Sequence, residues 1–239
     1  MRALFIQQDH VSPVGPVGEA FVERGYDVEE FLVVPEDRFH EPSVDVAFPD
    51  PLGFDVIVPM GAPWSVYDHA TIGAWVLEEV GLLRRAHDAG VPVLGICFGG
   101  QALATALGGS VERAPEAEIG WYDLESDDPG LIEGGPWFQW HHDRWTPPPG
   151  ARTLARTPLA PSQAFVLGRS LAVQFHPELT VTQLQGWFDN GGAAYLDEHG
   201  YDTAAVMART VAEADSAADR SRRLVGRFLD QVAAAPSAP

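Results

Sequence analysis

Hydrophobic and polar positions follow two alternating patterns along the first part of the chain, as far as Gly108. The runs RALFIQ, DVEEFLVVP, FDVIVPMGAP and VPVLGI are typical of strands, and the last is apolar almost throughout, as in strands buried on both faces. Residues 71–89 have apolar side chains three and four positions apart, which predicts a helix that Gly90 ends. EAFVERG and FGGQALATAL are also helical in pattern. The alternation predicts an α/β fold with an open, mostly parallel sheet flanked by helices.

The second half of the chain is richer in strands at first and helical afterwards. EIGWYDL, PSQAFVLG and SLAVQF are typical of strands, whereas DDPGLIEGGPWFQWHHDRWTPPPGA, rich in Trp, Gly and Pro, is interpreted as a loop. From residue 180 the pattern is helical, and Asp202 can cap a helix that continues past residue 212. The last helix has an apolar face made of Leu224, Val225, Phe228, Leu229 and Val232.

No internal repeat and no clear linker divides the chain. We therefore predict one domain over residues 1–190, followed by a C-terminal helical extension over 191–239 that packs on the same domain. The segment 233–239 is rich in Ala, Pro and Ser, which predicts a disordered tail.

Composition and charge narrow the classes of function. The formal net charge is −19, which argues against a partner nucleic acid and against an anionic membrane surface, because both require basic patches. All basic residues apart from histidine are arginine, so no P-loop lysine exists to bind a nucleoside triphosphate. No apolar run approaches the length of a membrane span, and the N-terminus lacks a signal-peptide pattern. With one cysteine and no internal disulfide, we expect a cytoplasmic protein.

The single cysteine lies in the stretch GICFGGQ, where a strand pattern meets a helix pattern. Glycines stand two positions before and two positions after Cys97, as in the G-x-nucleophile-x-G elbow of hydrolases. At a helix N-terminus the thiolate is favoured by the helix dipole, and the N–H of Phe98 can face a developing oxyanion. A lone cysteine is more often a small buried hydrophobe, but the strand, the two glycines and the helix together favour a nucleophile.

A cysteine nucleophile needs a base, and His176 is the candidate among the eight histidines. It ends the apolar run SLAVQFHPE, and Glu178, two residues on, can fix the tautomer of its imidazole. The competing interpretation is a strand-end histidine bonded to backbone. The remaining candidates for a base have polar or helical surroundings and are interpreted as surface residues: His10, His40, His69, His87 and His199.

Two further features fit the same site. Gly61 follows the third strand pattern, so its N–H is expected at the same sheet edge as Cys97, as a second oxyanion donor; the alternative is an ordinary turn. In the predicted loop, the stretch WHHD (residues 140–143) offers three polar side chains to a zwitterionic ligand. We expect no metal and no cofactor, since no CxxC or HExxH spacing is present.

These motifs together resemble the class I (triad) glutamine amidotransferases, most closely the glutaminase portion of GMP synthase and its stand-alone relatives. The resemblance covers residues 54–178 and rests on GAPWSVYD, AGVPVLGICFGGQALATALGG, EIGW, WHHD and LAVQFHPE. It implies a flavodoxin-like class I glutaminase fold. It also implies that Cys97 attacks a glutamine amide, that His176 carries the protons, and that Glu178 orients His176. Backbone N–H groups of Gly61 and Phe98 then hold the oxyanion.

The resemblance also implies contacts with the substrate. Gln101, one helical turn after the nucleophile, and the segment with Trp140, His141 and Asp143 match positions near glutamine in the family. Glu118 and Gly120 match a family motif whose role is not assigned. The chain departs from the family at Ala62, where a second glycine is usual, and at Phe98, where leucine is usual.

The resemblance leaves several functions open. No Gly-rich pyrophosphate loop of a synthetase domain is present, so the ammonia would go to a separate acceptor subunit, or the protein would hydrolyse another γ-glutamyl amide or peptide for its own purpose. We expect low activity on glutamine alone. The remaining alternatives are a non-catalytic regulatory module of the same fold and a different cysteine chemistry on a related fold. A homodimer is left open.

Overall fold

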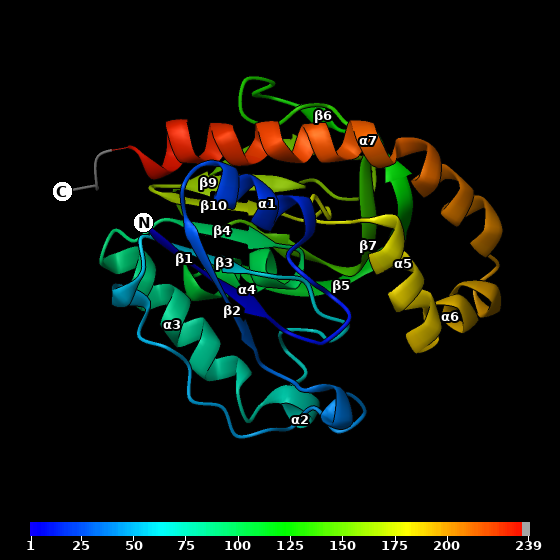
Figure 1. The fold of residues 1–239 in the computed structure, drawn as a ribbon, viewed down its shortest axis with the longest axis horizontal. Coiled ribbons are helices and arrows are strands. Elements are labelled where there is room, and N and C mark those ends of the chain that lie inside the picture. Colours follow the sequence, from blue (N-terminus) through cyan, green and yellow to red (C-terminus); the bar gives the residue numbers. More distant parts are fainter. Residues whose placement is uncertain (236–239) are drawn as a thin grey trace.

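A computed structural model of the chain describes residues 1–235. Its centre is an eight-stranded sheet in the order β2-β1-β3-β4-β10-β9-β8-β6 (Figure 1). The parallel strands are β1 (Arg2–Gln7), β2 (Asp27–Leu32), β3 (Val56–Pro59), β4 (Val93–Ile96) and β10 (Ser170–Val173). The antiparallel continuation consists of β9 (Ala164–Leu167), β8 (Arg152–Arg156) and β6 (Glu125–Ser126). The predicted open and mostly parallel sheet is therefore confirmed.

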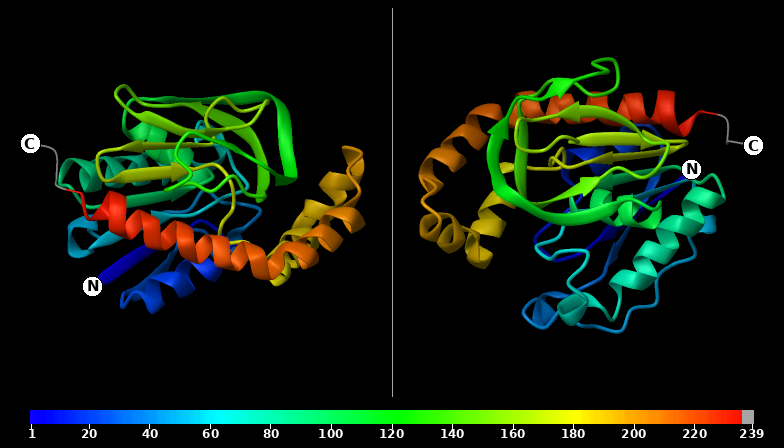
Figure 2. Two further views of the ribbon diagram at one scale, coloured as in Figure 1. Left: turned by 90° about the horizontal axis from the view of Figure 1, so that it is seen from above. Right: turned by 180° about the vertical axis from the view of Figure 1, so that it is seen from behind.

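Two long strands form a separate ribbon beside this sheet. β5 (Ser110–Tyr122) pairs antiparallel with β7 (Trp137–Thr146). Figure 2 shows the ribbon curving across the back of the molecule, away from α1. The first half of β5 was not predicted, and β6 and β8 were also missed.

Helices cover both faces of the sheet, and side chains of alternate parity in each strand meet them. Phe5 belongs to the first core cluster, between the sheet and α1 (Gly15–Glu23), and Ile6 belongs to the second, between the sheet and α3 (Val76–Asp88) and α4 (Phe98–Ala106). In the same way Val58 of β3 joins the first cluster and Ile57 joins the second. This alternation explains why the strand patterns are apolar throughout rather than on every second residue.

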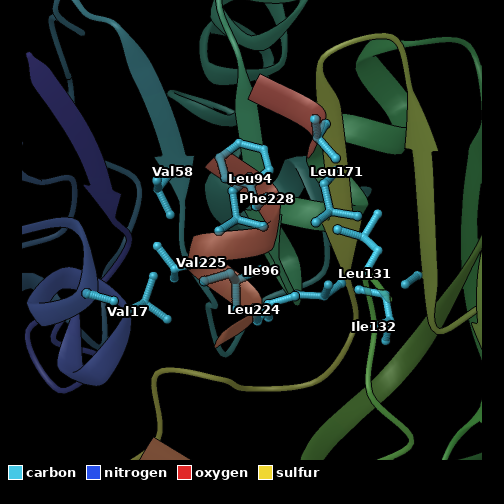
Figure 3. Close-up of a cluster of buried hydrophobic side chains, with 14 of the residues drawn as sticks. Val17, Val58, Leu94, Ile96, Leu131, Ile132, Leu171, Leu224, Val225 and Phe228 are labelled. Carbon is cyan, nitrogen blue, oxygen red and sulfur yellow. The ribbon is translucent and has the colours of Figure 1, made fainter. Parts of the chain in front are cut away.

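The C-terminal helices complete the first core cluster. After α5 (Val181–Trp187), the segment η3 (Phe188–Gly192) and α6 (Ala193–Glu198), the long helix α7 (Thr203–Arg227) runs along the sheet and continues as η4 (Phe228–Ala233) (Figure 1). Figure 3 shows Leu224, Val225 and Phe228 against Val17 and Leu94. The predicted apolar face is thus buried, and the carboxylate of Asp202 caps α7 as expected, by accepting a hydrogen bond from the N–H of Ala205.

The end of the described chain is held in place. Ala233, the first residue of the predicted disordered tail, is buried, and its carbonyl accepts hydrogen bonds from the Arg169 guanidinium. Ala233 is therefore part of the packed structure, while residues 236–239 of that predicted tail lie outside the described residues. The same arginine donates to the carbonyl of Gly90 at 2.6 Å, which ties η4 to the end of α3.

The helix predicted over 71–89 is in fact two helices. α2 (His69–Ile72) is short, and α3 begins only at Val76. Between them Trp75 is fully buried, and its indole N–H donates to the carbonyl of Pro42 at 2.8 Å. We attribute the interruption to this side chain, whose burial and hydrogen bond fix the backbone outside helical geometry at the start of α3.

The stretch predicted as a Trp-rich loop contains β7, which corrects that prediction. Its side chains alternate between buried and partly exposed from Gln139 to Trp145. Aromatic residues favour strands, and β5 supplies the backbone partners along β7. Glycine and proline flank the strand closely on both sides. Because these residues are typical of loops, the whole stretch was interpreted as a loop. Within residues 1–235, no helix is both long and apolar enough to cross a lipid bilayer.

Candidate functional site

Cys97 lies at a sharp turn between β4 and α4. Its backbone angles are φ 49° and ψ −108°, and it is the one residue other than glycine with positive φ among residues 1–235. A Cβ added to Gly95 would lie 2.7 Å from the carbonyl oxygen of Gly99, and one added to Gly99 would lie 2.0 Å from the carbonyl oxygen of Pro59. Both positions therefore exclude side chains, as the elbow pattern predicts.

His176 and Glu178 form a buried pair beside this turn. His176 follows β10, and its Nδ1 lies 2.7 Å from Oε1 of Glu178, a carboxylate with no exposed surface. Nε2 of His176 has no hydrogen-bond partner among the described residues. Burial acts to lower the pKa of His176, but the Glu178 carboxylate and the Cys97 sulfur outweigh it and raise the pKa well above its ordinary value. The pair thus favours an imidazolium next to the thiol.

Gly61, which follows β3, lies close to both His176 and Cys97. A Cβ at Gly61 would lie 3.0 Å from Cε1 of His176 and 3.7 Å from the Cβ of Cys97. The three residues therefore share one sheet edge, as predicted from the parallel strands. Neither Gly61 nor Phe98 donates its backbone N–H to another group of the described chain. Phe98 begins α4, where the N–H has no partner within the helix.

Two glutamines line the buried side of the thiol. Nε2 of Gln174 lies 3.5 Å from Sγ of Cys97, and Oε1 of Gln174 accepts from Nε2 of Gln101 at 3.4 Å. Both side chains are almost fully buried. Gln101 was predicted as a substrate contact, whereas Gln174 was missed, although it stands two residues before His176 in the same motif.

The predicted residues on β7, Trp140, His141 and Asp143, line a cavity together with Cys97 and His176. The carbonyl of Trp140 is 4.0 Å from Sγ of Cys97. The Asp143 carboxylate is buried and accepts from the Ser65 hydroxyl at 2.5 Å and from the Tyr67 hydroxyl at 2.8 Å. Ser65 and Tyr67 were not singled out, although they belong to the motif GAPWSVYD after β3.

A buried polar network lies beside the β7 residues of the site. Oε2 of Glu118 lies 3.1 Å from Nε2 of His141 and accepts from Nε2 of Gln163 at 2.6 Å. Nδ1 of His141 lies 2.9 Å from the carbonyl oxygen of Asp143. Glu118, whose motif had no assigned role, therefore lies behind His141 in the pair of strands that carries Asp143. Gly120 of the same motif has φ 111°, which glycine adopts without strain.

The cavity above Cys97 has a volume of about 410 Å³. It is lined by every predicted site residue except Glu178, which pairs with His176, and by residues that sequence reasoning missed: Asp9, Val11, Ser12, Phe39, Trp64, Arg113, Trp187, Asn190 and Tyr195. The stretch QDH follows β1 as GAP follows β3, so its place at the carboxyl end of a parallel strand was a usable signal. Residues 1–235 contain no group of three or more His, Cys, Asp or Glu side chains that could hold a metal ion.

Comparison with known proteins places this geometry in context. The family model for glutamine amidotransferase class-I matches residues 19–191. A GMP synthase (glutamine-hydrolyzing) from Aeropyrum pernix is 40% identical over 152 residues, which cover 57% of this chain and 28% of that protein. One from Parafrankia sp. is 50% identical over 99 residues, covering 38% of this chain and 18% of the relative. The chain thus spans less than a third of the length of these curated relatives.

Solved structures share the whole fold. A crystal structure of a glutamine amidotransferase from Thermotoga maritima superposes with a TM-score of 0.81, covering 97% of this chain and 99% of that chain at 24% identity. A glutamine amidotransferase from Methylobacillus flagellatus gives a TM-score of 0.79, covering 100% and 96% at 23% identity. At this identity the likeness shows the fold, including the C-terminal helices.

Proposed function

Because the chain belongs to the glutamine amidotransferase class-I family, we propose that it hydrolyses a γ-glutamyl amide through a thioester on Cys97. One observation carries the proposal. The only thiol of the chain lies at a strained turn beside His176, whose Nε2 is free of partners and whose Nδ1 is held by Glu178 at 2.7 Å. This arrangement supports a nucleophile, a proton carrier and a group that orients the carrier.

The first half-reaction follows from the charges of this group. The raised pKa of His176 keeps the imidazole protonated, and the imidazolium stabilises a thiolate on Cys97. The thiolate attacks the γ-carbonyl carbon and forms the C–S bond. As the C–N bond breaks, Nε2 of His176 gives its proton to the leaving nitrogen, which departs as ammonia or as an amine.

The second half-reaction restores the enzyme. Neutral His176 takes a proton from water, the hydroxide attacks the thioester carbonyl, and the C–S bond breaks to give glutamate and the thiolate. In both halves the carbonyl oxygen carries negative charge in the transition state. We propose that the free N–H groups of Gly61 and Phe98 donate to it.

We assign the substrate's amino-acid end to the β7 side of the cavity. The carboxylate of Asp143 can accept from the α-ammonium, and it is held in place by Ser65 and Tyr67. Gln101, Trp140 and His141 are retained as predicted contacts of the γ-glutamyl group, since all three line the same cavity.

We also propose the division of the chain into a class I amidotransferase domain over 1–190 and a C-terminal extension over 191–239. Gly191, Gly192 and Tyr195 line the cavity, so this extension contributes to the site rather than standing apart from it. For the released ammonia, the GMP synthase relatives support a separate synthetase subunit as acceptor. The alternative is a stand-alone hydrolase of other γ-glutamyl amides.

The experiment that tests the proposal is release of ammonia and glutamate from glutamine by the purified protein, beside Cys97→Ser. A glutamine-analogue electrophile, followed by mass spectrometry, reports whether the thiol is competent when turnover is slow. Labelling or turnover that vanishes in Cys97→Ser supports the proposal. A folded wild-type protein whose Cys97 neither turns over glutamine nor reacts with the electrophile contradicts it.

A further inference from the structure

Two series of contacting residues, here called arms, lead from the reactive pair along the lining of the cavity. One arm follows β7 from the Trp140 carbonyl to Asp143 and Ser65. The other arm starts at His176, whose ring packs edge-on against Trp187 with centroids 5.0 Å apart. The indole N–H of Trp187 donates to the Ser12 hydroxyl at 3.3 Å, and that hydroxyl donates to Asp9 at 3.1 Å. We call Asp9, Val11, Ser12 and Trp187 the amine arm.

The chemistry of the reaction decides which end of the substrate enters which arm. A proton carrier must lie within hydrogen-bond reach of the nitrogen that it protonates. In the proposed reaction that carrier is His176, so the leaving nitrogen is on the His176 side of the thiol. Any substituent on that nitrogen continues past the indole of Trp187, while the amino-acid end lies along β7.

Ammonia has no substituent, and an arm that served only ammonia would need no recognition groups. Asp9 is 1% exposed and lines the cavity. Its carboxylate accepts from the N–H of Val11 at 2.9 Å and from the hydroxyl of Ser12, both neutral donors. Among the described residues it forms no ion pair, and a carboxylate accepts up to about four hydrogen bonds, so capacity remains. Burial raises the pKa of Asp9 to about 6, although hydrogen bonds from Ser12 and Val11 and the charge of His10 act to lower it.

A buried carboxylate that is held by neutral donors and forms no ion pair costs free energy, which a positively charged ligand group offsets. The neighbouring surface of the arm is apolar, from Val11 and the indole of Trp187, and suits a methylene chain. Resting on the proposed hydrolysis of γ-glutamyl amides, we propose that the amine arm is a binding subsite for the leaving amine, and that Asp9 selects amines that carry a second positive charge. The substrate class is then the γ-glutamyl monoamide of a diamine or polyamine.

Three matched substrates test the subsite with the purified full-length protein. Each is a γ-glutamyl amide with the same four-carbon chain on nitrogen, which ends in an ammonium, a methyl or a carboxylate group. We expect kcat/KM to be about tenfold to a hundredfold higher for the ammonium amide than for the methyl amide, as for one charge-assisted hydrogen bond. The carboxylate amide is expected to be the poorest of the three, because like charges repel.

The variant Asp9→Asn should reduce the ratio of ammonium to methyl amide to about one. The exposed carboxylate of Asp27, at the amino end of β2, provides the matched control, since Asp27→Asn makes the same charge change at the sheet edge opposite the cavity and should keep the wild-type ratio. The readout is a ratio within each variant, so a partly folded preparation does not distort it, and labelling of Cys97 counts the competent sites.

The outcomes separate this inference from the proposed function. Equal kcat/KM for the ammonium and methyl amides in the wild type overturns the subsite, and so does a preference that survives Asp9→Asn. Hydrolysis of glutamine alone, with all three substituted amides refused, also overturns it while the proposed function stands. If no amide is hydrolysed and Cys97 stays unlabelled, the proposed function fails and the subsite fails with it.

Discussion

Replacing Glu178 with glutamine removes a charge and almost nothing else. The glutamine has the same size, and its amide oxygen can occupy the position of Oε1, 2.7 Å from Nδ1 of His176. The backbone of the elbow, the cavity and the thiol are untouched. The substitution therefore tests whether the carboxylate charge, rather than the shape of the pair, keeps the imidazole protonated beside Cys97.

The magnitude follows from burial. Glu178 has no exposed surface and His176 is 5% exposed, so solvent screens their interaction little. Removing one partner of a buried ion pair costs about 3–5 kcal/mol, because the remaining charge is left without compensation. If about 3–4 kcal/mol of this appears in the transition state, kcat/KM falls roughly 100- to 1000-fold. In the variant the pKa of His176 moves down, because the carboxylate that raised it is gone.

The single cysteine supplies an assay that needs no substrate. Alkylation by iodoacetamide reports on Cys97 alone, since the chain contains no other thiol. Its rate across neutral pH follows the imidazolium that stabilises the thiolate, so Glu178→Gln should alkylate more slowly than wild type at neutral pH. Glu198→Gln, on the exposed end of α6, makes the same change in charge and should alkylate at the wild-type rate.

A clear result would refute this reasoning. If folded Glu178→Gln keeps kcat/KM within about threefold of wild type and shows the same alkylation profile, the charge of Glu178 is not what prepares His176. The pair would then hold the imidazole by geometry alone.

Three further predictions concern stability. The pKa of Glu79 is raised to about 8 by burial, so the wild type should lose stability as pH rises from about 4.5 to about 8, by up to about 1.4 kcal/mol per pH unit. Glu79→Gln, which keeps the hydrogen bond to Gln8, should abolish this loss in thermal unfolding at several pH values. Because φ is 49° at Cys97, Cys97→Gly should be about 1–3 kcal/mol more stable than Cys97→Ala in urea unfolding. Arg169→Met leaves the Ala233 carbonyl without its donor, and should cost about 1–3 kcal/mol and speed hydrogen exchange at the end of η4.

The parts of the fold that could be predicted are those in which the local pattern and the burial agree. β4 and α4 follow from an apolar run, two glycines and a helical pattern, and the turn at Cys97 follows from their junction. The partnership of His176 with Glu178 was also within reach, because the two residues are separated by one position. In these places the interacting residues are close together in the sequence, so their contacts can be predicted from it.

The rest depended on contacts between distant segments. β7 is a strand because β5 pairs with it, and that partner is not visible in the composition around Trp140. Trp187 reaches the cavity because α5 packs beside the loop after β1, where Ser12 accepts its indole N–H. Neither segment has a sequence pattern that indicates the contact, so Trp187 remained outside the predicted site, whereas Asp9 could have been found from its place after β1.

The C-terminal helix α7 also determines when the first core cluster can form during synthesis. The first core cluster contains Phe21 and Leu94 together with Val225 and Phe228, so it joins the earlier part of the chain to its C-terminal helix. During synthesis the sheet strands emerge long before α7, and until α7 docks, one face of the sheet presents apolar side chains to water. Contacts at such separation form slowly, and the exposed face is a surface for chaperones or for aggregation. Cys97 belongs to this same cluster, so the nucleophile acquires its final surroundings only when one of the last helices has closed over the sheet.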